Sequence, residues 1–193
     1  LIPVYLLTNY FGVQAAGYFF LTRSVLMVPV NIIGKAVYDV AYPKLSSDFG
    51  NKPISLFLLG STLSLLALSF VPMAILFFWG DVIFSLVFGD EWSKAGLYAG
   101  CMSFWFAINL SNRACVAAVS LLKLDRFLLG NGVVNIIVSS TGFIAGYSIW
   151  GTDTAAIFLF YLFAMVAQLS LIFKVIYEAR KIDKKLLLVG GIV

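Results

Sequence analysis

Long apolar segments alternate with short charged segments along the whole chain. The apolar segments run for roughly 20 to 28 residues, enough for a helix to cross a hydrocarbon core of about 30 Å. Because lipid offers the backbone no hydrogen-bond partner, such segments are expected to be helices. We therefore predict an all-α fold, a polytopic transmembrane helical bundle with about five complete spans and one truncated span. The complete spans are predicted near residues 16–42, 54–79, 95–122, 127–150 and 154–174, and the truncated one at 1–9.

The composition agrees with a membrane protein and removes several classes of enzyme. Hydrophobic residues make up 62% of the chain and charged residues 11%, against roughly 45–50% and about 25% in soluble domains. There is no His, and the 2 Cys cannot supply a four-Cys zinc site. The chain also has no phosphate-binding Gly-Lys-Ser/Thr loop and no Ser or Cys nucleophile beside a base. The sequence therefore predicts a protein that is not an enzyme and that uses no metal or cofactor.

The basic residues predict how the spans are oriented. Lys and Arg number 0, 2, 1, 2, 0 and 5 in the successive connections 8–15, 42–53, 81–94, 123–126 and 151–154 and in the tail 174–185. Short cytoplasmic loops retain Lys and Arg, so the second and fourth connections and the tail are expected to face the cytoplasm. The basic tail is better explained by contact with anionic membrane lipids than by nucleic-acid binding.

Four charged residues, Arg23, Lys35, Asp39 and Arg113, lie inside predicted spans. A charge at the centre of a membrane helix costs roughly 2.5–3.5 kcal/mol by insertion scales, so such residues usually serve a function. Lys35 and Asp39 are one helical turn apart and can either neutralise each other or line a cavity. Arg23 lies roughly 9 Å inside the outer end of its span, close enough for partial snorkelling.

Arg113 is the most deeply placed of these charges. It precedes Lys123 by ten residues, which corresponds to about 15 Å of helix and places it near the midplane. Trp105, Asn109 and Arg113 follow at successive i+4 steps on one face. One interpretation is a guanidinium presented to a phosphate or pyrophosphate. The other is a buried counter-ion for a carboxylate elsewhere in the protein.

A second polar row, Asn131, Asn135 and Ser139, continues along one helical face to Gly142 and Gly146. Such a row can line a cavity, where Asn131, Asn135 and Asp39 would be candidates for cavity lining or ion coupling. It can equally form hydrogen bonds across a helix contact, with the glycines allowing close approach. We favour the packing interpretation.

Several short motifs resemble those of one transporter family. They are residues 9–12 (NYFG), 16–19 (AGYF), 22–23 (TR), Pro29, 42–45 (YPKL) and 87–96 (VFGDEWSKAG). In this pattern the chain resembles the polysaccharide flippases, which include the O-antigen and capsule flippases of the multidrug/oligosaccharidyl-lipid/polysaccharide exporter superfamily.

The resemblance implies an architecture and a function. Members have twelve to fourteen helices in two six-helix halves, and residues 1–193 look like the C-terminal half with its first helix truncated. The start at Leu1 within an apolar run leads us to expect a fragment, with a missing N-terminal half as partner and 186–193 as the possible start of another span. The implied function is to flip undecaprenyl-pyrophosphate-linked oligosaccharide to the outer leaflet of the bacterial inner membrane by alternating access. The candidate substrate-binding residues are Arg23, Lys35, Asn109 and Arg113.

Two other functions remain open at this point. A cation-coupled drug antiporter of the same superfamily would need intramembrane carboxylates, and the predicted spans contain only Asp39. A membrane-embedded polysaccharide polymerase or glycosyltransferase would need a large outer loop with acidic catalytic residues, whereas the predicted outer loops are short.

Overall fold

The computed structural model describes residues 2–190, with side chains to residue 188. All regular structure in this range is helical, which confirms the predicted all-α class. In chain order the elements are α1 (Ile2–Phe11), α2 (Val13–Asp48), α3 (Ser55–Phe88), the 3-10 turn η1 (Asp90–Trp92), α4 (Ser93–Ser111), α5 (Arg113–Ala118), α6 (Asp125–Trp150) and α7 (Asp153–Gly190).

Four of these helices, α2, α3, α6 and α7, are long and apolar enough to cross a membrane. The chain is therefore a multi-pass membrane protein. The predicted count of five complete spans plus a truncated one is not confirmed, because the third complete predicted span, 95–122, corresponds to two shorter helices, α4 and α5. This pair packs against α2, α3 and α7, and a helix surrounded by protein can be less apolar than one that faces lipid.

Three helices extend beyond their predicted spans. The helix predicted at 16–42 continues to Asp48, the one at 54–79 continues to Phe88 through a non-helical Trp79, and the one at 154–174 continues to Gly190. Residues 186–190 thus prolong α7, whereas 191–193 lie outside the described residues. Charged residues ended the predicted spans, but a helix whose end leaves the hydrocarbon continues readily through charged residues in water.

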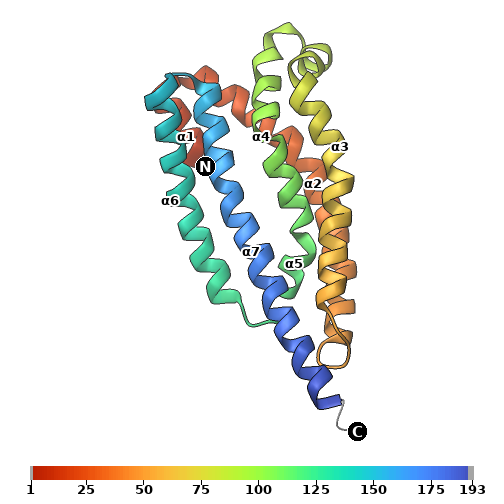
Figure 1. The fold of residues 1–193 in the computed structure, drawn as a ribbon. Coiled ribbons are helices and arrows are strands. Elements are labelled where there is room, and N and C mark those ends of the chain that lie inside the picture. Colours follow the sequence, from red (N-terminus) through yellow and green to blue (C-terminus); the bar gives the residue numbers. More distant parts are fainter. Residues whose placement is uncertain (1, 191–193) are drawn as a thin grey trace.

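The connections group at two opposite ends of the molecule (Figure 1). The α2–α3 connection, the segment between α5 and α6, and the end of α7 lie toward one end. The α1–α2, α3–α4 and α6–α7 connections lie at the other. This is the grouping that the basic residues predict, with the Lys- and Arg-rich connections together on one side.

Glycines set the two closest helix contacts. A Cβ on Gly96 of α4 would lie 2.1 Å from the Gly80 carbonyl oxygen of α3. On α6, a Cβ on Gly142 would lie 2.8 Å from the Leu159 carbonyl oxygen, and one on Gly146 would lie 2.7 Å from that of Ala155. Backbones come this close only where no side chain intervenes. The structure thus supports the packing interpretation of the small residues on α6.

A carboxylate from the far end of the chain caps α3. Asp183 on α7 is 6% exposed, and its Oδ1 and Oδ2 accept hydrogen bonds from the backbone N–H groups of Ile54 (3.0 Å) and Ser55 (2.8 Å). The first N–H groups of a helix have no partner within the helix, and its positive end favours an anion. Asp183 therefore ties α7 to the α2–α3 connection.

Replacing this cap should destabilise the protein. We expect Asp183→Ala to lower the free energy of unfolding by about 1–3 kcal/mol, the usual cost of leaving buried donors without a partner. The measurement is thermal unfolding of the full-length protein in detergent. Glu178→Ala on the same helix is the control, since Glu178 pairs at the surface with Lys174 and such pairs contribute about 0–1 kcal/mol. Equal unfolding temperatures for the two variants would contradict the capping role.

Candidate functional site

Arg113 follows the junction between two consecutive helices in the middle of the bundle. Helix α4 ends at Ser111 and α5 begins at Arg113, with Asn112 as a turn between them. The buried Asn112 side chain donates from Nδ2 to Oε1 of Gln168 on α7 at 2.7 Å. Backbone hydrogen bonds continue across this residue, from Asn112 N–H to the Ile108 oxygen at 3.0 Å and from Val116 N–H to the Asn112 oxygen at 2.9 Å. The bond to Gln168 therefore fixes the junction of α4 and α5 against α7, directly before Arg113.

The Arg113 guanidinium is half-buried between α2 and α4. Its Nη2 donates to Asn109 Oδ1 at 3.0 Å, so the predicted common face of these two residues is observed. On the α2 side it lies over Gly34, where an added Cβ would come 2.8 Å from Arg113 Nε. That Nε is buried and has no hydrogen-bond partner. Within the described part of the chain the guanidinium forms no ion pair, so no carboxylate there serves as its counter-ion.

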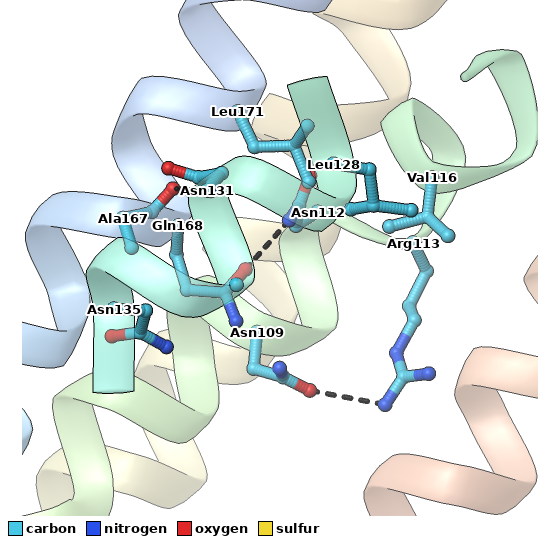
Figure 2. Close-up of a pocket in the computed structure, with 11 residues that line it drawn as sticks. Asn109, Asn112, Arg113, Val116, Leu128, Asn131, Asn135, Ala167, Gln168 and Leu171 are labelled. Atoms are coloured by element: carbon cyan, nitrogen blue, oxygen red, sulfur yellow. Dashed lines mark hydrogen bonds between the residues drawn. The ribbon is translucent and has the colours of Figure 1, made fainter. Parts of the chain in front are cut away.

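Arg113 borders a pocket of about 190 Å³ between α4, α5, α6 and α7. The lining is rich in amides: Asn109, Asn112, Asn131, Asn135 and Gln168. Figure 2 shows the Asn109 amide between Arg113 and Asn135, with the Asn112–Gln168 hydrogen bond beside it. Apolar residues complete the wall: Val116, Leu128 and Leu171, with Gly132 and Ala167. Arg113 is the one charged residue in this lining.

A second pocket, of about 240 Å³, adjoins the first. It is lined by Arg23 from α2, Trp105 from α4, Asn135 and Ser139 from α6, and Tyr161 from α7, together with apolar residues. Asn135 lines both pockets, and Trp105 precedes Asn109 by one turn of α4. The two pockets are therefore neighbours, and we call them together the arginine tract, with Arg23 in one pocket and Arg113 in the other.

Unpartnered polar atoms mark this tract. Trp105 Nε1 and Asn135 Oδ1 are buried without a hydrogen-bond partner, as is Arg113 Nε. Buried polar atoms are usually hydrogen-bonded, so a group of unpartnered ones calls for an explanation such as a bound ligand. The tract thus offers donors from Arg23, Arg113 and Trp105, and no carboxylate lines either pocket.

The two arginines are separated along α2. Arg113 lies against Gly34, and Arg23 precedes Gly34 by eleven residues on the same helix, which is about 16 Å of axial rise. An anionic group could therefore contact one guanidinium and then the other as it moves through the tract.

The polar row on α6 has divided roles. Asn131 donates from Nδ2 to the Ala167 carbonyl oxygen at 2.9 Å and accepts from Ser170 Oγ at 2.9 Å. It therefore holds α6 on α7 and also lines the first pocket. Ser139 donates to its own helix at Asn135, while the Asn135 side-chain oxygen stays unpartnered. Packing and cavity lining thus coexist in one row.

Lys35 and Asp39 lie elsewhere. Both side chains are exposed on α2, and neither lines the arginine tract. Nor do they pair with each other, since the ion pairs in residues 2–188 are Lys52–Asp48, Lys94–Asp153 and Lys174–Glu178. The neutralising pair predicted from their spacing is not observed among these ion pairs.

Four polar or contacting members of the site were not predicted from the sequence: Asn112, Gln168, Tyr161 and Gly34. Gln168 carried a usable signal, as the one amide in the predicted 154–174 span. Tyr161 carried a weaker one, as a phenol within an apolar run, and it packs on Trp105 with ring centroids 5.2 Å apart. Gly34 carried none, because its role depends on a side chain 79 positions away.

One protein family is similar to the N-terminal part of the chain. A family model described as polysaccharide biosynthesis protein matches residues 2–96. The matched segment belongs to this family. The match contains all of the motifs that carried the resemblance in the sequence, together with Arg23 of the arginine tract and Gly34, which lies against Arg113. Neither a curated protein nor a solved structure matches the chain. The four apolar helices make the chain a multi-pass membrane protein, and its residues 2–96 are similar to polysaccharide biosynthesis proteins.

Proposed function

We propose that this chain is part of a flippase that moves polyprenyl-pyrophosphate-linked oligosaccharide from the cytoplasmic to the outer leaflet of the bacterial inner membrane. The observation that carries the proposal is the environment of Arg113. A half-buried guanidinium that pairs with no carboxylate among residues 2–188 faces a pocket lined by amides. Such a group is a bidentate ligand for phosphate oxygens in surroundings that strengthen the interaction.

The size of the pockets indicates which part of the substrate they would hold. At about 190 and 240 Å³, each is smaller than the roughly 300–1,000 Å³ of sites that enclose a whole small molecule. We therefore assign the pyrophosphate to the arginine tract. The sugars would occupy water between this half and an N-terminal half of the same protein, and the polyprenyl chain would stay in lipid. Substrate binding by Arg23, Asn109 and Arg113 belongs to this proposal, whereas Lys35 lies outside both pockets.

The antiporter alternative draws less support from the structure. Proton- or sodium-coupled exchange needs a carboxylate inside the membrane, and the lining of both pockets contains none. A polymerase would need a large catalytic loop at the outer end, where the described connections are short.

The full-length protein in lipid vesicles tests the proposal. We expect a lectin added outside to bind an increasing fraction of undecaprenyl-pyrophosphate oligosaccharide that was loaded into the inner leaflet only. The monophosphate-linked oligosaccharide is the matched substrate control and should move more slowly, because it offers fewer oxygens to the two arginines. Absence of lectin binding combined with gradient-driven efflux of a cationic dye would overturn the flippase in favour of the antiporter.

Gly34 offers a subtler test of the same site. In Gly34→Ala the new Cβ would meet the Arg113 side chain at 2.8 Å, and the flexible guanidinium must move. We expect delivery of the glycan to fall about tenfold, since a misplacement near 1 Å can cost roughly 100-fold. Gly17→Ala in the same helix is the control, because a Cβ there has no neighbour within 4 Å. Wild-type delivery by Gly34→Ala would show that the position of the guanidinium is unimportant.

A further inference from the structure

A second hollow lies outside the bundle, away from the arginine tract. It is an open groove of about 640 Å³ between residues 32–41 of α2 and 57–65 of α3. Its lining is apolar apart from Ser61 and Ser64. The groove exists because α2 packs on α4 and α5, and α3 packs on α4, while α2 and α3 make little direct contact with each other.

The groove has the length of one lipid leaflet. From Ile32 to Ala41 it follows nine residues of α2, or about 14 Å, close to half of the 30 Å hydrocarbon core. It ends near the α2–α3 connection, which lies on the side that the basic residues assign to the cytoplasm. Ile32 and Val40 are 67% and 71% exposed on this face. A chain lying in the groove would thus extend from the cytoplasmic surface to the middle of the bilayer.

A lysine stands at the cytoplasmic mouth of the groove. Lys44 Nζ lies 4.4 Å from the centre of the Phe57 ring, which itself lines the groove. Unlike Lys52, which pairs with Asp48 at 3.6 Å, Lys44 forms no ion pair with any described residue. The aromatic ring holds the ammonium in place without neutralising it. The groove therefore joins an apolar trough to a fixed positive charge at headgroup level.

We propose that this groove is a binding site for an anionic phospholipid of the cytoplasmic leaflet. One acyl chain would lie along α2 and α3, and the phosphate would contact Lys44. Charge selects the occupant, because a zwitterionic or neutral lipid gains less from an unpaired ammonium. Length selects a leaflet lipid over the much longer polyprenyl chain. The site is separate from the arginine tract and does not depend on the flippase proposal.

Native mass spectrometry of the purified full-length protein tests the site. The probes are phosphatidylglycerol and phosphatidylcholine with identical acyl chains. We expect the wild type to retain phosphatidylglycerol preferentially and Lys44→Ala to reduce that preference about fivefold, the factor that corresponds to about 1 kcal/mol per basic residue at an anionic surface. Lys44→Arg should keep the preference. Ala36→Trp, which fills the exposed groove, should lose both lipids.

Lys52→Ala is the matched control, because it removes a lysine from the same connection that is already paired with Asp48. Four results would overturn the proposal. They are an unchanged preference in Lys44→Ala, an equal loss in Lys52→Ala, retention of lipid by a folded Ala36→Trp, and complete displacement of phosphatidylglycerol by undecaprenyl phosphate. The last would assign the groove to the polyprenyl chain. Absence of lipid from the wild type would also overturn it, by showing that protein covers the groove.

Discussion

Arg113→Ala should lower delivery of the glycan to the outer leaflet by roughly 10- to 100-fold, because a hydrogen bond to a charged group contributes about 1.5–3 kcal/mol. The guanidinium borders the amide-lined pocket and has no carboxylate partner among the described residues. Alanine removes both the charge and the two-pronged donor that matches a phosphate. The measurement is lectin binding at the surface of vesicles that contain the full-length protein.

Two further variants separate the function of Arg113 from its contribution to folding. Arg113→Lys keeps the charge and loses the planar fork, so we expect intermediate delivery. Arg126→Ala removes an exposed arginine that lines neither pocket, and it should leave delivery unchanged. If Arg113→Ala inserts normally and delivers glycan at the wild-type rate, Arg113 does not bind the substrate.

Gly96→Leu should prevent α3 and α4 from packing. Even a Cβ at this position would lie 2.1 Å from the Gly80 carbonyl oxygen and 2.6 Å from Asp81 Cα. Both neighbours are backbone atoms, so the helices must separate as rigid bodies. Overpacking usually costs about 1–3 kcal/mol, and we expect the upper end of this range or complete loss of the folded protein. Thermal unfolding and size-exclusion chromatography in detergent measure the effect.

Gly60→Leu is the matched control for this change. It introduces the same side chain in α3 at a position where an added Cβ has no neighbour within 4 Å. We expect stability equal to or slightly above that of the wild type, since glycine in a helix costs roughly 0.5–1 kcal/mol relative to alanine. Similar unfolding temperatures for Gly96→Leu and Gly60→Leu would contradict the close α3–α4 contact.

Hydropathy alone predicted where the helices lie, but not all of their boundaries. Each complete predicted span contains helix in the structure, because long apolar segments in lipid have few alternatives. The junction of α4 and α5 within 95–122 could not be predicted, since it lies at Asn112, whose side chain is bonded to Gln168, 56 positions later in the chain. The extension of α7 was missed for a related reason. Asp183, in the charged end of α7, accepts hydrogen bonds from the backbone at the start of α3. No local sequence pattern predicts that contact.

The residues of the candidate site were likewise predicted only in part. Depth in the membrane predicted Arg113, and spacing predicted its contact with Asn109. The same depth argument selected Lys35, whose side chain the structure leaves exposed on α2. The depth of a charged residue in a span indicates its energetic cost. It does not indicate which neighbouring helix the side chain faces.

The sequence by itself determined that this is a helical membrane protein and which end carries the basic connections. It also determined which charged residues lie inside membrane spans, where a charge is energetically costly. Helix formation in lipid, the side of the membrane that a basic connection faces and the cost of a charge within a span are properties of single segments in contact with lipid or water. Composition and periodicity are therefore sufficient to predict them. The tertiary structure alone decided that Arg23 and Arg113 border neighbouring pockets, that Gly34 makes room for a guanidinium, and that Asp183 caps α3. Each of these depends on which helix faces meet, and contacts between residues as far apart as Ile54 and Asp183 leave no periodic trace in the chain.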